Sequence, residues 1–551
     1  MEQQEKKKTL LLWSLLAVML VFCMLVSAMS RRREEQTVPD APRESGTESD
    51  GGKDDPVLPE NYDQIDESTL LDGLALNGTQ LPRCVDGMFY LCVDGDAASL
   101  LREGVWSVES GASLTLDKRV SRADTDFDAL IAKNRPILID AVIGEKHLQG
   151  RIVLTTLPVM VVTPEEGLTA DDIVHGDDGE DLPCRITLLD AAAFRGGTPQ
   201  LLEQNAGIHI RGGTARYYPK KSYKFSLKNS WGDSYKTSLA GMRTDDDWIL
   251  LAGYTDGSKV REKLSAELWA EIISDRAYSG ASTHLEYVEL VMDGAYAGLY
   301  LLQEPVDAKT AGAQEGNYLY KSLNWDYPDR ERGSWGGFEL KYPKKADEQQ
   351  SADAFDVLCR YAEWVQNSSD REFLETMEAM LDVEEWIDHY LFISLIYGYD
   401  NLMNNNYYLA QPDADGLHIR IIPWDFDCTF GYSNWLVVND DGTTEQHYLD
   451  RMPVDGMEDT LAVERMYGAD RSALLLRAGT RWRSLRERLL NEEYLEKKLR
   501  GLFGTLEASG AYRRDEALWN DYFPLASDEE KYLSEFLEEQ LERFDRFFKT
   551  K

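Results

Sequence analysis

The first strong pattern along the chain is a long apolar run near the N-terminus. Residues Thr9 to Met29 carry no charge, and a helix that rises about 1.5 Å per residue makes this run long enough to cross the hydrocarbon core of a membrane. The run is longer than the apolar core of a typical signal peptide, which favours an uncleaved signal anchor over a cleaved one. Lysines before the run and arginines after it balance in the positive-inside count. We predict a single-pass anchor in the cell membrane over residues 1–33, with the bulk of the chain extracytoplasmic.

Apolar periodicity is almost absent from the next segment, residues 34–68. Glu, Asp, Pro, Gly and Ser dominate its composition. Such a segment cannot bury a hydrophobic core and stays unfolded in water. We therefore expect an acidic, disordered stalk.

Short apolar runs separated by Gly and Asp turns follow the stalk. This spacing is typical of short strands joined by tight turns. The sequence predicts a small β domain over residues 69–162. The domain carries no catalytic constellation, so we expect it to act as a spacer or binding module. Its apolar runs are Met88–Val93, Leu114–Leu116, Pro136–Val142 and Arg151–Leu154.

From residue 163 onward, strand-like and helix-like patterns are mixed. Alternation on both sides of Asp293-Gly294 predicts a β-hairpin, and apolar residues at helical spacing predict amphipathic helices. After Asp440 the chain is expected to be mainly helical. The prediction is an α+β domain over residues 163–551 with a helical C-terminal part. The expected strands are Ile208–Arg211, Lys221–Leu227, Leu285–Met292 and Tyr296–Gln303, and the expected helices are Ser258–Ile273, Glu385–Tyr397 and Asp528–Phe548.

Length and charge narrow the possible functions. A chain of 551 residues exceeds what one hydrophobic core usually organises, so two or three folded units are expected. The chain has 98 acidic against 59 basic residues and a formal charge of -39. Such a surface repels phosphate backbones, so we expect no nucleic-acid partner.

The six cysteines are too few for a disulfide framework in a chain of this length, so we expect none. No CxxC pair is present, which argues against structural zinc. Cys84 and Cys92 are placed either to bridge two neighbouring strands or to remain as two unpaired thiols.

The residues with the clearest chemical pattern lie between Tyr399 and Gly431. Asp400 follows the predicted helix, and Asn405 comes five positions later. A short strand, a turn and a second strand then lead to the acidic segment Asp425-Phe426-Asp427. Protein kinases have the same order, with a catalytic Asp, a metal-binding Asn five residues on, a hairpin and a metal-binding Asp.

The residue types suit that chemistry. Mg²⁺ prefers a few hard oxygen ligands and leaves its other positions to water and phosphate. Phosphoryl transfer then needs an Asp that aligns the attacking hydroxyl, the role we predict for Asp400. Each of these Asp and Asn residues taken alone is equally explained as a turn former or cap. It is their joint occurrence that favours a functional site.

A second, weaker pattern offers cations for nucleotide phosphates. Arg211, Gly212 and Gly213 form a glycine turn, and Lys221 and Lys224 lie on the strand that follows. Alternation along a strand points these lysines to opposite faces, so only one can face a cleft. A solvated basic strand edge explains the same residues. No Walker motif is present.

Several sequence blocks in a fixed order resemble the CotH (spore coat protein H) kinase-like family. The resemblance covers roughly residue 163 to the C-terminus, and the succession of blocks is far more specific than any one of them. The blocks are Gly207–Gly213, Pro219–Lys224, Asp247–Leu250, Asp256–Arg261, Tyr296–Glu304 and Pro423–Asp427.

The resemblance implies an atypical, two-lobed protein-kinase-like fold that uses ATP and Mg²⁺ or Mn²⁺ to phosphorylate serine in secreted, cell-surface or spore-coat proteins. It implies Asp400 as the catalytic Asp, Asn405 and Asp425 as metal ligands, and Lys221 or Lys224 as the phosphate-pairing lysine. Asp427 is either a further ligand or a cap. Placement on the predicted helix suggests Glu267 as the partner of the lysine. The chain departs from ordinary protein kinases in having Gly398-Tyr399-Asp400 and Asp425-Phe426-Asp427 at the two motif positions.

Two other functions compete with a kinase. A catalytically silent, kinase-like surface scaffold would keep the fold and bind proteins or glycans. A glycoside hydrolase would use two carboxylates on a sugar, although only the acidic, Trp-rich composition favours it. Serine-hydrolase and zinc-protease motifs are absent.

Overall fold

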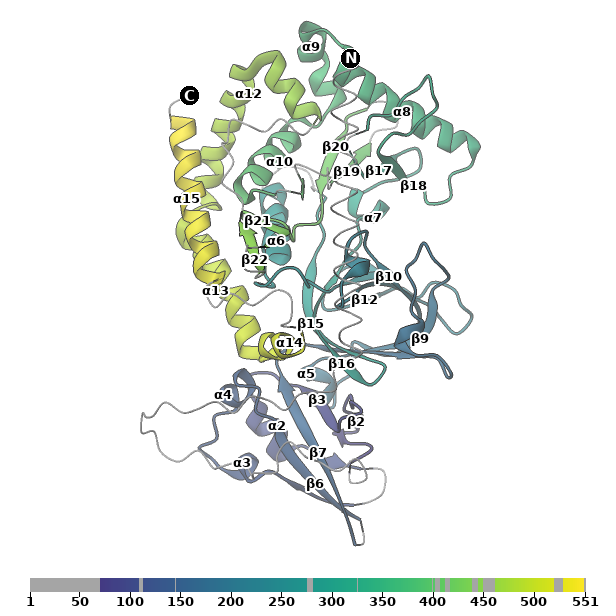
Figure 1. Ribbon diagram of the computed structural model, residues 1–551, viewed down its shortest axis with the longest axis vertical. Coiled ribbons are helices and arrows are strands. Elements are labelled where there is room, and N and C mark those ends of the chain that lie inside the picture. Colours follow the sequence, from purple (N-terminus) through teal and green to yellow (C-terminus); the bar gives the residue numbers. More distant parts are fainter. Residues whose placement is uncertain are drawn as a thin grey trace. The chain divides into compact units, whose positions relative to one another are not determined.

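The computed structural model describes residues 70–108, 112–143, 145–274, 281–324, 326–398, 400–401, 407–411, 417–438, 444–448, 461–519 and 529–549 (Figure 1). Every described residue belongs to one compact unit, residues 65–551. None of the described helices is long and apolar enough to cross a membrane. The predicted anchor at Thr9–Met29 and the predicted stalk lie outside the described residues, so both remain predictions.

Residues 70–155 form two small sheets covered by short helices. The larger sheet has the strand order β3-β7-β6-β5, with β3 and β7 parallel and the other pairs antiparallel. A smaller sheet has the order β2-β1-β4. The strands are β1 (Ala75–Leu76), β2 (Thr79–Gln80), β3 (Met88–Cys92), β4 (Trp106–Ser107), β5 (Ser113–Leu116), β6 (Ile137–Ile143) and β7 (Lys146–Thr155).

The predicted strands of this region are confirmed, but three helices were missed. They are α2 (Ala97–Glu103), α3 (Lys118–Ser121) and α4 (Phe127–Ala132). Each begins after an aspartate, Asp96, Asp117 or Asp126, whose side chain accepts a backbone N–H of the first turn. Aspartates of this kind occur both at helix N-termini and in turns, and the sequence prediction assigned them to turns. Cys84 and Cys92 are both buried, free thiols.

Seven strands between residues 159 and 303 close into a barrel of order β10-β11-β14-β16-β15-β8-β9. The predicted hairpin is confirmed: β15 and β16 pair antiparallel around Asp293 and Gly294, whose φ angles of 51° and 71° suit a tight hairpin turn. The barrel strands are β8 (Val159–Pro164), β9 (Leu182–Leu189), β10 (Leu201–Arg211), β11 (Ser222–Leu227), β14 (Asp247–Leu251), β15 (Leu285–Met292) and β16 (Ala295–Gln303).

Short elements fill the connections of the barrel. Strands β12 (Thr237–Ser238) and β13 (Thr244–Asp245) pair with each other. The remaining elements are the 3-10 turns η2 (Ala170–Asp172) and η3 (Ala215–Tyr217) and the helices α5 (Ala191–Phe194) and α7 (Ala308–Ala311).

Helix α6 (Arg261–Ser274) joins the barrel to the C-terminal helices. Leu264 and Leu268 of α6, and Val260 just before it, are fully buried, as their spacing predicts. They share one large hydrophobic core with β15, with helix α10 and with the helices that follow. Figure 1 shows α6 beside α10, between the barrel and the C-terminal helices.

The C-terminal part contains a second sheet and a layer of helices. The sheet has the antiparallel order β18-β17-β19-β20, and β21 and β22 form a separate hairpin that the sequence did not predict. The strands are β17 (Tyr318–Ser322), β18 (Phe338–Tyr342), β19 (Tyr407–Gln411), β20 (Arg420–Pro423), β21 (Tyr432–Val438) and β22 (Thr444–Tyr448).

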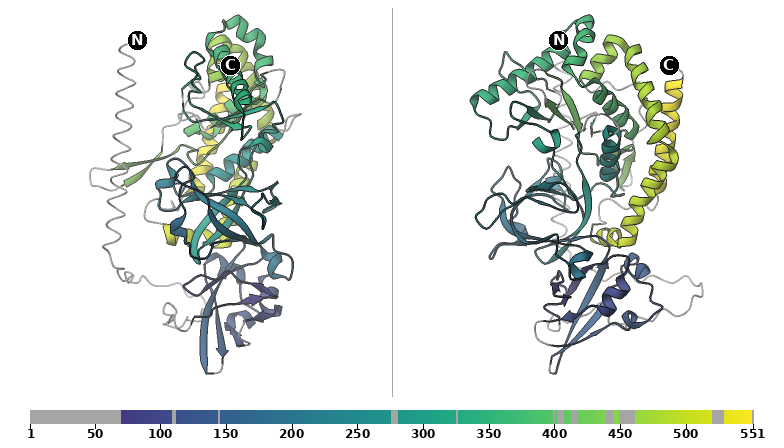
Figure 2. Two further views of the ribbon diagram at one scale, coloured as in Figure 1. Left: turned by 90° about the vertical axis from the view of Figure 1, so that its right-hand side faces the viewer. Right: turned by 180° about the vertical axis from the view of Figure 1, so that it is seen from behind.

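The helices of this part pack against one another through apolar stripes. Seen from behind in Figure 2, α15 runs along α12 and α13. Phe536 and Phe544 of α15 are fully buried, and each contributes roughly 2 kcal/mol by leaving water. The predicted helices ending at Tyr397 and Phe548 are thus confirmed to within about two residues. The helices are α8 (Glu348–Asn367), α9 (Asp370–Met380), α10 (Val383–Ile396), α12 (Leu461–Arg488), α13 (Glu492–Ser509), α14 (Ala511–Trp519) and α15 (Glu529–Lys549). The mixed α+β class is confirmed.

Candidate functional site

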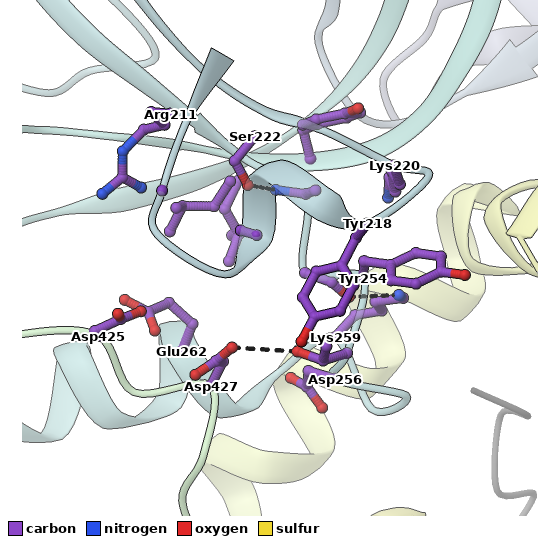
Figure 3. A pocket seen from close by; sticks show the side chains of 18 of the residues that line it. Arg211, Tyr218, Lys220, Ser222, Tyr254, Asp256, Lys259, Glu262, Asp425 and Asp427 are labelled. Carbon is purple, nitrogen blue, oxygen red and sulfur yellow. Dashed lines mark hydrogen bonds between the residues drawn. The ribbon is translucent and has the colours of Figure 1, made fainter. Parts of the chain in front are cut away.

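A cavity opens between the barrel and the segment that follows β20 (Figure 3). The glycine turn after β10, the ends of β14 and β16, and the segment before α6 form its walls. Carboxylates form its floor. The side chains that define it are Arg211, Tyr218, Lys220, Ser222, Tyr254, Thr255, Lys259, Glu262, Tyr300, Asp400, Asp425 and Asp427.

Three aspartates converge on the floor from two segments. Asp400 lies just after α10, and Asp425 and Asp427 follow β20. Ligand atoms of Asp400, Asp427 and the buried Cys428 all lie within 4.8 Å of one another. Asp425 has a φ angle of +67°, a left-handed conformation that a side chain with a Cβ adopts at a cost. The turn is therefore held in a strained conformation that brings the side chains of both Asp425 and Asp427 to the cavity.

Hydrogen bonds fix this turn against its neighbours. The Phe426 N–H donates to Glu262 Oε2 at 2.6 Å, and the Thr255 hydroxyl donates to Asp427 Oδ2 at 3.2 Å. The Asn401 side-chain amide donates to the Trp424 carbonyl at 2.8 Å. The loop that carries Asp400 and the turn that carries Asp425 are thus tied together through Asn401.

The acidic side chains of the floor are difficult to ionise, because they are buried and lie close to one another. Burial, together with the neighbouring Asp425 and Asp400, raises the pKa of Asp427 to about 8. Burial also raises the pKa of Glu262 well above its usual value, again with Asp425 and Asp427 adding to the effect. Carboxylates this close favour binding of a proton or of a cation. Figure 3 shows Asp425, Glu262 and Asp427 grouped on the same side of the cavity.

The opposite side carries backbone turns and cations. Gly212 has a φ angle of +100°, and a Cβ there would lie 2.9 Å from the Ala215 side chain, so only glycine fits this turn. The Arg211 guanidinium lies over the Trp424 ring, 5.6 Å from its centroid. Lys220 and Lys259 line the same wall. An anionic ligand would therefore meet cations above and, through a metal, carboxylates below.

A model of the family described as CotH kinase protein matches residues 208–543. The chain belongs to this family. The match contains the whole cavity, from Arg211 to Asp427, and continues through α14. No curated protein matches the chain.

The carboxylates of this CotH family member fit a divalent metal. Asp425 and Asp427 offer hard oxygen atoms at the cavity, and ligand atoms of Asp427 and Asp400 lie within 4.8 Å of each other. The Cys428 thiol is buried and hydrogen-bonds to Asp427. We therefore assign it to the support of Asp427 and not to the metal. An all-oxygen set with room for phosphate suits Mg²⁺ or Mn²⁺.

The site residues predicted from sequence divide into three groups. The structure brings Asp400, Asp425, Asp427, Arg211, Gly212 and Gly213 together around the cavity. Asn405 lies outside the described residues and stays a prediction. Lys221, Lys224 and Glu267 lie away from the cavity lining.

The two predicted lysines bind other parts of the protein. The Lys221 amine donates to the Arg216 carbonyl at 2.7 Å, and the Lys224 amine donates to Asp247 at 3.2 Å. Lys220 lines the cavity instead. It lies in the turn just before β11, so an argument from alternation along the strand did not include it.

On α6 the structure places a different glutamate at the site. Glu267 forms ion pairs with Lys263 at 3.1 Å and with Lys498 of α13 at 2.6 Å. Glu262 lines the cavity. Nearly every residue in the first turns of α6 is buried, so the apolar stripe alone could not show which glutamate faces the cavity.

Proposed function

We propose that this chain is an ATP- and divalent-metal-dependent kinase that phosphorylates serine in secreted, cell-surface or spore-coat proteins. Family membership supports kinase chemistry. The observation that carries the proposal is one cavity in which Asp400, Asp425 and Asp427 face a glycine turn and cations. Phosphoryl transfer depends mainly on positioning and charge neutralisation, which these groups provide.

In this proposal each residue has a separate task. The metal-bound nucleotide supplies the phosphoryl group. Asp425 and Asp427 hold the metal, and the backbone of Gly212 and Gly213 approaches the phosphates. Arg211 offsets the phosphate charge. Asp400 orients the serine hydroxyl and accepts its proton.

The proposal also covers architecture and location. The barrel with α6 forms one lobe of a kinase-like fold, and the sheet β18-β17-β19-β20 with the C-terminal helices forms the other. The apolar run Thr9–Met29 anchors the chain in the membrane with the catalytic part outside. Full-length protein should remain in membranes after a high-salt wash, and external protease should digest most of the chain. If only the N-terminal tip is digested from outside, the orientation is wrong.

The decisive experiment measures ATP binding and phosphate transfer with and without metal. Calorimetry on the full-length chain should show ATP binding with Mg²⁺ or Mn²⁺ and its loss in excess chelator. Incubation with ATP and serine-containing acceptor protein should yield phosphoserine by mass spectrometry. Equal ATP affinity in chelator would contradict the metal-bridged site. Metal-dependent binding without any transfer would favour the silent scaffold.

A further inference from the structure

Helix α14 docks on an irregularity in strand β16 beside the cavity. The β15–β16 ladder shifts register between Leu290–Gly298 and Val291–Tyr296, which leaves Ala297 as an extra residue. The Ala297 carbonyl accepts a hydrogen bond from the Trp519 indole at 3.0 Å. Gly298 has a φ angle of +110°, and a Cβ there would lie 2.3 Å from Asp515 Oδ1. The bulge and the missing side chain thus let α14 approach the strand closely.

Asp515 and Lys220 take the place of a missing strand partner. Strand β14 pairs with β16 only from Leu301 onward. The backbone of Leu299 therefore has no partner from β14. The Leu299 N–H donates to Asp515 Oδ1 at 2.9 Å, and the Leu299 carbonyl accepts from the Lys220 amine at 2.5 Å. Lys220 and Asp515 also contact each other at 2.6 Å. Four polar groups therefore satisfy one another at the cavity wall.

The same carboxylate reaches the second lysine of the wall. Asp515 Oδ2 lies 3.4 Å from the Lys259 amine, which also donates to the Gly253 carbonyl at 2.7 Å. Lys259 has a φ angle of +60°. Asp515 is thus a shared counter-ion for two cavity-lining lysines that come from different elements.

Further contacts hold α14 in place. The Tyr512 hydroxyl donates to the Gly257 carbonyl at 2.9 Å, which ties the helix to the segment before α6. Arg514 forms a buried ion pair with Glu289 of β15 at 2.5 Å and donates to Asn134 at 3.0 Å. The helix is therefore fixed to the barrel on both sides of Asp515, and through Asn134 to the sheets of residues 70–155.

We propose that Asp515 is a positioning residue of the nucleotide site: it holds Lys220 charged, and both Lys220 and Lys259 in place, on the wall that faces the phosphates. This inference rests on the proposed function, because it assigns these lysines to the nucleotide. In ordinary protein kinases the glutamate that pairs with the phosphate-binding lysine comes from the helix next to the sheet. Here the carboxylate comes from α14, far along the chain.

The charges around the Lys220–Asp515 ion pair should make ligand binding depend on pH when Asp515 is replaced. Burial, which Asp515 offsets only in part, lowers the pKa of Lys220 to about 8. The other ionisable groups nearest the pair are Lys259, the tyrosines Tyr296 and Tyr300 of β16, and the Arg514–Glu289 ion pair. Without Asp515 the charge of Lys259 acts on Lys220 unopposed and Lys220 loses its proton more readily, so an anionic ligand should bind less well as the pH rises.

The main test is Asp515→Asn in the full-length protein. The amide keeps an oxygen for the Leu299 N–H and removes only the charge. We expect the Kd for Mg-ATP to rise about tenfold at pH 8.5, as for one unit of pKa change, and clearly less at pH 6.5. Glu516→Gln changes an exposed carboxylate on the same helix and should bind like wild type at both values.

A second variant covers the case in which Asp515→Asn fails to fold. Lys259→Met keeps the Lys220–Asp515 pair and removes one cation from the wall. It should fold and bind Mg-ATP about tenfold more weakly, a loss typical of one charge-assisted contact. Lys236→Met, at an exposed lysine, is the control.

The outcomes separate this inference from the proposed function. If the folded Asp515→Asn and Lys259→Met variants bind Mg-ATP as wild type does at both pH values, Asp515 is purely structural and the inference is overturned while the kinase proposal stands. Weaker binding of Asp515→Asn by the same factor at both pH values also overturns it. If wild type itself binds no Mg-ATP, both proposals fail together.

Discussion

The wall and the floor of the cavity treat charge in opposite ways. On the wall, Lys220 and Lys259 share the buried carboxylate of Asp515. On the floor, burial and the neighbouring carboxylates of Asp425 and Asp400 all raise the pKa of Asp427. The wall is balanced by the protein's own carboxylate, whereas the floor gathers like charges that favour binding of a proton or of an added cation.

This difference separates residues that maintain the fold from residues that await a ligand. A buried ion pair that loses one partner leaves an uncompensated charge, so a substitution on the balanced side should destabilise the protein. A substitution that removes one of several crowded carboxylates relieves repulsion, so it should stabilise the free protein and weaken ligand binding. A substitution of a floor carboxylate should therefore raise the stability of the free protein and lower its ligand affinity.

The largest effect is expected for Asp400→Asn. In the proposed reaction this side chain accepts the proton of the serine hydroxyl, and loss of a general base costs about 10³-fold in rate. Turnover should fall by that factor while Mg-ATP binding, measured by calorimetry, changes little. Glu339→Gln, at an exposed strand carboxylate, provides the matched control. Full activity in Asp400→Asn would contradict its catalytic role.

The next effect concerns the balanced network behind the wall. The fully buried Arg261 contacts Asp256 at 2.8 Å and Glu529 of α15 at 2.7 Å. Arg261→Met leaves both carboxylates without their cation, which should lower the free energy of unfolding by about 3 kcal/mol or more. Chemical denaturation measures this loss, with Arg513→Met at an exposed position of α14 as the control. Equal stability of the two variants would show that the buried ion pairs of Arg261 do not maintain the fold.

A smaller effect is expected for Asp425→Asn. The side chain is exposed at the cavity, and a bound metal would make a charge-assisted contact with it. We expect Mg-ATP to bind about a hundredfold more weakly, on the scale of removing one preorganised electrostatic group, with turnover falling alongside. Thermal stability in chelator should not fall. Unchanged metal-dependent ATP binding would remove Asp425 from the metal site.

The sequence predicted those parts of the molecule that depend on neighbouring residues. The hairpin around Asp293-Gly294 follows from a turn that tolerates positive φ, and α15 follows from an apolar stripe along a single helix. The order of Asp400, the β19–β20 strands and Asp425-Phe426-Asp427 likewise belongs to one continuous stretch. These local patterns were enough to indicate the floor of the site.

The wall could not be predicted because its contacts join distant segments. Lys220 and Asp515 are 295 positions apart, and no local pattern links a turn before β11 to a helix near the C-terminus. The choice of Lys221 or Lys224 considered only residues on the strand. The choice of Glu267 failed to find Glu262 because α6 is buried on most of its surface, which only tertiary packing determines.

The smallest effect, and the most direct test of the comparison, concerns Asp427→Asn. The folded protein holds the carboxyl proton more tightly than the unfolded chain, since the pKa of Asp427 is raised to about 8. The stability that this proton contributes is complete below about pH 4, the ordinary range of an Asp, and is lost as the pH rises toward 8. Asn resembles the protonated acid and does not lose this contribution.

In chelator, the stability of Asp427→Asn should therefore be close to that of wild type near pH 5. At pH 8.5 the variant should be more stable than wild type. Because the side chain is only half-buried and water screens it, we expect a difference of about 1 kcal/mol at pH 8.5. With saturating Mg²⁺ and ATP the order should reverse, since wild type then gains a ligand contact that Asn lacks. Melting curves at both pH values, with and without Mg-ATP, provide all four comparisons. If Asp427→Asn is less stable than wild type in chelator at pH 8.5, the floor is already balanced by the protein and the contrast with the wall is wrong.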